Sequence, residues 1–152
     1  MTHANSTGSF PGHDSNRPMR LALDVMGGDH APDAVMKGCI LALQDLSPED
    51  RIVLVGPRRI IEETLEDRGV SDSRLEIEHC DEVIAMDDSP AKAVRQKTNS
   101  SIVRMAHLGS KSAEKRCDVV LSAGNTGACV AAAMLHMRRL PGVLRPGIAV
   151  TV

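Results

Sequence analysis

Aromatic side chains are almost absent from this sequence. It has no Trp and no Tyr, and its single Phe is Phe10, close to the amino terminus. Aromatic faces are the platforms on which nucleic-acid bases and sugars stack, so binding of that kind is excluded. The hydrophobic core has to be built from Val, Ile, Leu, Met and Ala.

Long apolar runs, paired cysteines and a dominant charge are lacking as well. No apolar run approaches the ~20 residues of a membrane-spanning helix. The 4 cysteines form no CxxC pair, which argues against a metal site and favours buried, reduced thiols in a cytoplasmic protein. Lys and Arg number 18 against 20 Asp and Glu, for a formal net charge of −2. The charge therefore predicts no binding to nucleic acid or to an acidic membrane surface.

Two regions differ in composition. The first 18 residues are rich in Ser, Gly, Asn, His and Pro and lack the apolar core of a signal peptide, which predicts a disordered extension. Residues 19–152 have the length and apolar content of one folded domain.

Strand-like and helix-like segments alternate along residues 19–152. Short apolar or alternating runs predict strands over residues 19–25, 51–56, 75–80, 117–124 and 147–152. Helices are expected after Pro32, over 57–69, from Ser89 as N-cap with Pro90 at the first position, and over 126–140. The pattern predicts an α/β three-layer sandwich with a mostly parallel sheet. No helix follows the last predicted strand, which suggests part of a larger domain.

Two glycine-containing loops follow predicted strands, where ligands of such folds bind. In the first, Gly27 and Gly28 allow close approach of a ligand to the backbone, although two glycines after a strand more often form a plain turn. In the second, "SAGNTGA" (122–128), glycines flank Asn125 and Thr126 at the start of a helix. Free N–H groups and the helix dipole at that point favour a phosphate or an oxyanion. Neither GxGxxG after the first strand nor GxxxxGK[ST] is present, so the fingerprints of dinucleotide and nucleoside triphosphate sites are missing and no cofactor is expected.

A basic segment, "SPAKAVRQKTNSSIVR" (89–104), offers two interpretations. Lys92, Arg95 and Lys97 lie within two predicted helical turns, and Ser100 and Ser101 follow at a helix break. The segment is either a solvated basic helix face or an anion clamp in which Arg95 binds phosphate and the serines donate hydrogen bonds.

Three separated motifs carry a resemblance to a known family. "LALDVMGGDHAP" (21–32), "DSPAKAVRQKTNSSI" (88–102) and "LSAGNTGA" (121–128), in this order and spacing, resemble the bacterial phosphate acyltransferase family of phospholipid synthesis, the PlsX family. The resemblance covers residues 19–152 and corresponds to the amino-terminal half of family members. It implies a fold similar to that of phosphotransacetylases and of isocitrate and isopropylmalate dehydrogenases.

The resemblance implies a reaction in which inorganic phosphate attacks the thioester of acyl-acyl carrier protein (acyl-ACP), giving acyl phosphate and free carrier protein. Because the task is to hold phosphate and stabilise an oxyanion, we assign Asn125 and Thr126 as candidate catalytic residues. Asp24 is expected to organise the first loop. The expected phosphate and substrate contacts are Gly27, Gly28, Asp29, Arg95, Lys97, Ser100, Ser101, Ser122, Gly124, Asn125, Thr126 and Gly127.

The resemblance further implies a homodimer in the full-length protein, and a cytoplasmic location with peripheral attachment to the inner face of the membrane through the carboxyl-terminal half. Two alternatives remain at this point. The chain is a non-catalytic fragment of such an enzyme, or it is a related nucleotide-binding α/β enzyme.

Overall fold

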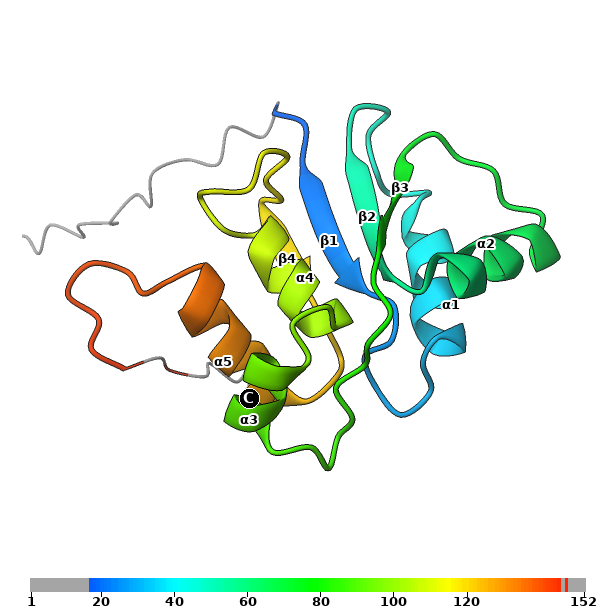
Figure 1. Ribbon diagram of the computed structural model, residues 1–152. Coiled ribbons are helices and arrows are strands. Elements are labelled where there is room, and N and C mark those ends of the chain that lie inside the picture. The colour runs from blue at the N-terminus through cyan, green and yellow to red at the C-terminus, as the bar shows by residue number, and fades with distance from the viewer. Residues whose placement is uncertain (1–16, 146, 148–152) are drawn as a thin grey trace, which may run out of the picture.

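A computed structural model describes residues 17–145 and 147, and it contains one four-stranded sheet (Figure 1). All strand pairs are parallel and the strand order is β3-β2-β1-β4. The strands are β1 (Arg20–Asp24), β2 (Arg51–Gly56), β3 (Leu75–His79) and β4 (Val119–Leu121). This confirms the predicted parallel α/β architecture. The disordered extension predicted for residues 1–18 lies outside the described residues, apart from Arg17 and Pro18. The strand predicted for residues 147–152 lies outside them too, apart from Gly147.

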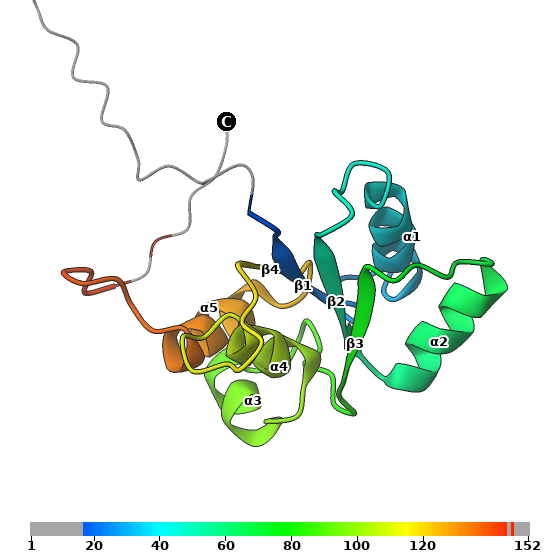
Figure 2. The same ribbon diagram turned by 90° about the horizontal axis from the view of Figure 1, so that it is seen from above.

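Helices cover both faces of the sheet (Figure 2). Within the described residues the helices are α1 (Asp33–Ala42), α2 (Arg58–Asp67), α3 (Pro90–Gln96), α4 (Ser101–Leu108) and α5 (Thr126–His136). Buried residues of α1 and α2 pack with Leu23 and Leu54 on one face, whereas Met105 of α4 packs with Ala22 on the other. Helix α5 packs against both α3 and α4. Alternate residues of the central strands β1 and β2 thus point to opposite covered faces, which is why these two strands are mostly apolar, whereas the edge strand β3 alternates Leu and Ile with Glu.

Two predicted elements are shorter in the structure than in the sequence analysis. Strand β4 spans three residues rather than 117–124, because it pairs only with β1 among the described residues. Helix α5 ends at His136 rather than near residue 140, and Arg138 has a left-handed backbone with φ 70°. Ser89 occupies the predicted N-cap position of α3, but its side chain makes no capping hydrogen bond.

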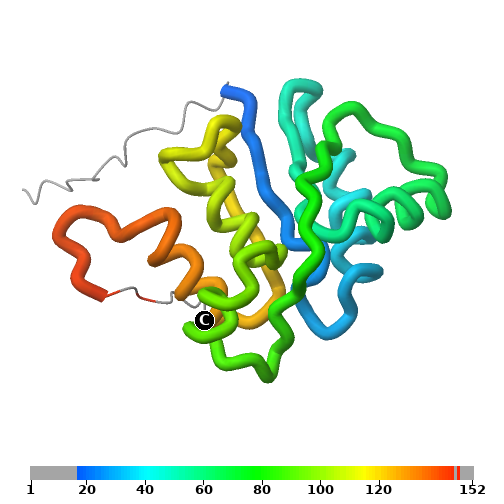
Figure 3. The backbone as a smooth tube through the Cα atoms, in the orientation of Figure 1, coloured from blue at the N-terminus to red at the C-terminus, as the bar shows by residue number. Residues whose placement is uncertain are grey.

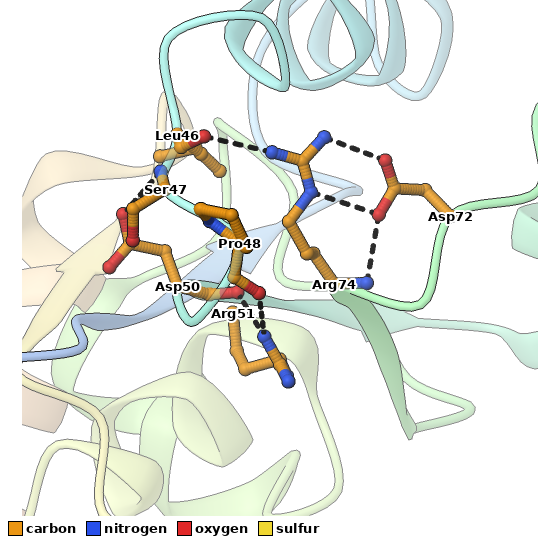
Figure 4. Close-up of polar contacts among 7 residues, drawn as sticks. All are labelled: Leu46, Ser47, Pro48, Asp50, Arg51, Asp72 and Arg74. Carbon is orange, nitrogen blue, oxygen red and sulfur yellow. Dashed lines mark hydrogen bonds and ion pairs between the residues drawn. The ribbon is translucent and has the colours of Figure 1, made fainter.

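At the amino-terminal edge of the sheet, a polar cluster fastens the loops before β2 and β3 (Figure 4). The Arg74 guanidinium donates to both carboxylate oxygens of Asp72, at 3.0 and 2.7 Å, and to the carbonyl of Leu46 at 2.9 Å. The carboxylate of Asp50 accepts from the N–H groups of Met19 and Ser47. The hydrogen bonds from Arg74 hold the pKa of Asp72 down to about 2.

The Asp72–Arg74 pair predicts an acid-sensitive contribution to stability. The pKa of Asp72 is about 2 in the folded protein and about 3.9 when the chain unfolds. The contribution is therefore complete above about pH 4 and is lost as the pH falls toward 2. Thermal unfolding between pH 5 and pH 2 should show a smaller fall in melting temperature for Asp72→Asn than for the unchanged protein. Identical pH profiles would show that the pair contributes nothing.

Candidate functional site

The loops that follow β1, β3 and β4 emerge at the same edge of the sheet (Figure 3). From β1 the chain proceeds to β2 and then β3, whereas β4 lies on the other side of β1. The carboxyl ends of β1 and β4 therefore form a topological switch point, the place where open α/β sheets bind ligands. Both glycine-containing loops predicted to bind a ligand meet at this point.

The two loops are joined by a buried carboxylate. Asp24, at the end of β1, is 1% exposed, and its Oδ2 accepts a hydrogen bond from Ser122 Oγ at 2.7 Å. Its Oδ1 accepts from the N–H of Met26 at 3.1 Å, and Ser122 Oγ accepts in turn from the N–H of Gly124 at 3.0 Å. Asp24 thus organises more than its own loop. Ser122, predicted to contact substrate, donates its hydroxyl proton to Asp24 in this structure.

Glycines are required here by contact between the loops. A Cβ on Gly27 would lie 2.7 Å from Asp24 Oδ2 and 2.9 Å from the N atom of Gly124. Gly28 has φ 103°, and a Cβ there would come within 3.2 Å of the Ala123 Cβ. From the sequence these glycines fit either ligand approach or a plain turn, and the structure supplies a further reason, which is the close contact of the two loops. Asp29 follows them on the surface and is exposed.

Asn125 connects the second loop to the chain between β3 and α3. Its Oδ1 accepts from the N–H of Ala128 at 3.0 Å, which caps α5. Its Nδ2 lies 3.1, 3.2 and 3.1 Å from the carbonyl oxygens of Ala85, Met86 and Asp88. Both amide hydrogens are therefore directed at the 85–88 segment, and Asn125 is 6% exposed. The sequence does not indicate residues 85–88 as part of the site. They contact Asn125 through backbone carbonyl groups, which leave no pattern of side chains.

The start of α5 presents donors that remain available. Thr126 and Gly127 are exposed, and within the described part of the chain their N–H groups have no hydrogen-bond acceptor. A Cβ on Gly127 would lie 2.7 Å from Pro90 Cγ, so this glycine allows α3 to approach α5. The two free N–H groups and the positive end of the α5 dipole make this turn suited to an oxyanion.

The 85–88 segment is fixed from a second side by Lys97. The Lys97 ammonium lies 2.5 Å from Asp88 Oδ2 and 3.0 Å from the carbonyl oxygen of Val83. Asp88 also accepts from the N–H of Ala85 at 2.8 Å. These contacts, with Lys97 the largest, lower the pKa of Asp88. Lys97 therefore has a clear structural role beside its predicted role as a phosphate partner.

The remaining predicted contacts are distributed differently. Arg95 is exposed and belongs to none of the ion pairs formed by the described residues. Ser100 and Ser101 are 0% and 1% exposed, at the point where residue 100 forms an isolated bridge with Glu82. The structure brings Arg95 to the surface as a free cation and buries both serines.

An apolar groove of about 450 Å³ begins beside the joined loops. Asp24 and Ser122 line one end of it, and the rest runs between α1 and the face of β1 and β4. Leu121, at the groove's outer side, is 53% exposed. Nothing among the described residues covers this face of β4.

Within residues 17–145 and 147, no three His, Cys, Asp or Glu side chains gather as metal ligands would, and no helix is long and apolar enough to cross a membrane. Cys39, Cys80 and Cys117 are buried free thiols, as predicted, whereas the free thiol Cys129 is only partly buried. Burial raises the pKa of Cys80 to about 12, which keeps this thiol protonated and unreactive.

Comparison with known proteins identifies the family. Residues 19–152 match the family described as "Fatty acid synthesis protein". The chain belongs to the fatty acid synthesis protein family. Members similar to it are named "Phosphate acyltransferase": those of Heliobacterium modesticaldum, Bacillus subtilis and Dictyoglomus turgidum are 46%, 43% and 42% identical to it.

The match to these members of the family is partial on their side. It covers 86–88% of this chain and 38% of each of the three relatives. It includes every residue of the loops described above. The recognised resemblance is confirmed, and so is its limitation to part of the family's length.

Proposed function

We propose that this chain forms the phosphate-binding part of the active site of a phosphate acyltransferase. Its substrates are inorganic phosphate and the acyl thioester of an acyl carrier protein, and its products are acyl phosphate and the free carrier. The observation that carries the proposal is the first turn of α5. Among the described residues its first two N–H groups have no acceptor, and hydrogen bonds of Asp24 and Asn125 hold the loop that precedes it.

The site residues fit this chemistry without a dedicated nucleophile. A phosphate oxygen attacks the thioester carbonyl carbon, the C–S bond breaks, and the proton carried by hydrogen phosphate passes to the leaving sulfur. The N–H groups of Thr126 and Gly127, with the Thr126 hydroxyl, hold the phosphate or the oxyanion that forms at the carbonyl. Preorganised donors of this kind need no reorientation during the reaction.

The family relationship supports the finer parts of this proposal. The relatives are named phosphate acyltransferase. As further parts of the proposal, the full-length protein binds an acyl carrier protein, forms a homodimer, and is a cytoplasmic protein attached peripherally to the inner face of the membrane. Because the chain matches about two-fifths of the length of those relatives, we assign catalytic activity to a protein of the relatives' full length. The chain taken alone we propose to be non-catalytic.

The test is a thioester-cleavage assay with acyl-ACP and phosphate. It compares this chain with a fusion that adds the carboxyl-terminal part of the Bacillus subtilis relative. We expect turnover only from the fusion. Within the fusion, Thr126→Ala should reduce turnover by roughly a hundredfold, the effect of losing one oxyanion donor. A fusion that folds but needs no phosphate would overturn the proposal.

Arg95 and Lys97 should respond differently to replacement by alanine in the same fusion. Arg95→Ala should raise the phosphate concentration needed for half-maximal rate and leave thermal stability unchanged, because Arg95 is exposed and unpaired. Lys97→Ala should also lower the melting temperature, since it removes the contacts to Asp88 and Val83. If Arg95→Ala instead weakens carrier-protein binding at normal phosphate dependence, the arginine serves docking.

A further inference from the structure

The hydroxyl of Ser122 occupies an unusual position in the candidate site. It lies in the second glycine-containing loop (residues 122–128), called the phosphate loop below. Its proton is nevertheless directed at Asp24 Oδ2, 2.7 Å away, and its oxygen accepts the N–H of Gly124 at 3.0 Å. One hydroxyl group therefore uses its donor on the first loop and an acceptor position on its own loop.

Asp24 is buried at one end of the apolar groove, where few groups can donate a hydrogen bond to it. The carboxylate is 1% exposed, and the donors to it are the N–H of Met26 and the hydroxyl of Ser122. A buried carboxylate without such donors is strongly unfavourable, so Asp24 and Ser122 depend on each other. The surrounding space is tight, because a Cβ on Gly27 would lie 2.7 Å from the carboxylate and 2.8 Å from Ser122 Oγ.

We propose that Asp24 and Ser122 are a pair of positioning residues for the phosphate loop, and that Ser122 itself does not contact phosphate. The pair fixes the backbone of residues 122–124, and through it the direction in which the N–H groups of Thr126 and Gly127 point. This role rests on the proposed function of the loop. It differs from the direct phosphate contact that the sequence predicts for Ser122.

The two roles give opposite results for Asp24→Asn. The amide side chain has an NH2 donor in place of one carboxylate oxygen, so in the same position it cannot accept from both the Met26 N–H and the Ser122 hydroxyl. If the pair positions the loop, phosphate binding weakens. If Ser122 is a phosphate donor, the same change frees its hydroxyl and removes a nearby negative charge, so phosphate binding strengthens.

The experiment titrates inorganic phosphate into this chain and follows the backbone amide signals of residues 124–127 by NMR. We expect Ser122→Ala and Asp24→Asn each to raise the dissociation constant roughly tenfold, and the double variant to raise it no further, as for residues that act as one unit. Ser122→Thr keeps the hydroxyl and should restore most of the affinity. The exposed Ser73→Ala is the matched control and should change nothing. Melting temperatures of all variants show whether a loss is confined to the loop.

Hydrogen exchange of the Gly124 amide separates this proposal from the proposed function. Both Ser122→Ala and Asp24→Asn should speed that exchange. The first removes the hydroxyl that accepts the Gly124 N–H, and the second removes the carboxylate oxygen that holds this hydroxyl in place. If the unchanged chain binds no phosphate but exchange speeds up in both variants, the positioning role stands and the phosphate site fails. Tighter phosphate binding in Asp24→Asn, additive effects in the double variant, or unchanged exchange would each overturn the positioning role.

Discussion

Replacing Asn125 by alanine is expected to lower the free energy of unfolding by about 2–4 kcal/mol, because the change removes a helix cap and leaves carbonyl groups unpaired. The side chain caps α5 through Ala128 and holds the carbonyl oxygens of residues 85, 86 and 88. Denaturant unfolding followed by circular dichroism measures the loss. In the fusion used for the activity test, turnover should fall at least as far as with Thr126→Ala, because the loop loses its anchor.

Two neighbouring substitutions sharpen this prediction. Thr126→Ala changes the adjacent, exposed residue and should leave the free energy of unfolding nearly unchanged. Asn125→Asp retains the oxygen that caps α5 but replaces the two N–H donors with a carboxylate facing three carbonyl oxygens. It should therefore remain destabilising. Equal stability of Asn125→Ala and Thr126→Ala would refute the anchoring role.

The 152-residue chain is expected to self-associate through β4 and the neighbouring groove. Val119 and Leu121 of β4 are 41% and 53% exposed, and the groove of about 450 Å³ beside them is lined largely by apolar side chains. The outer side of β4 pairs with no strand among the described residues. Exposed apolar surface and unpaired strand edges favour association between copies. Sedimentation velocity over a range of concentrations should reveal dimers or larger species.

A lysine on the edge strand β4 should reverse the self-association of the chain. Leu121→Lys places a charge on the face of β4, a device by which natural proteins protect sheet edges. Leu135→Lys is the matched control, because Leu135 on α5 is 54% exposed and lies away from β4. We expect Leu121→Lys to shift the protein toward monomer and Leu135→Lys to have little effect. A chain that stays monomeric at every concentration, or equal responses of the two variants, would contradict the prediction.

The sequence by itself determined the architecture, because its signals are local. Apolar runs such as residues 51–56 predict strands buried on both faces, and Pro90 after Ser89 predicts the start of α3. These features depend on near neighbours in the chain, and the structure confirms them at β2 and α3. The motif around Asn125 likewise indicated a ligand loop at a helix start. It also carried the family resemblance, which the comparisons confirm.

Only the tertiary structure decided what the individual side chains of the loop do. Ser122 and Asp24 are 98 positions apart and meet because β1 and β4 pair in parallel. Asn125 reaches carbonyl groups 37 to 40 positions earlier in the chain. Backbone carbonyl groups have no residue signature, and the partner of a buried polar side chain is set by which strands are neighbours. For that reason the sequence indicated which loops to consider, and the fold divided their residues into those that hold the loops together and those whose N–H groups have no acceptor within residues 17–145 and 147.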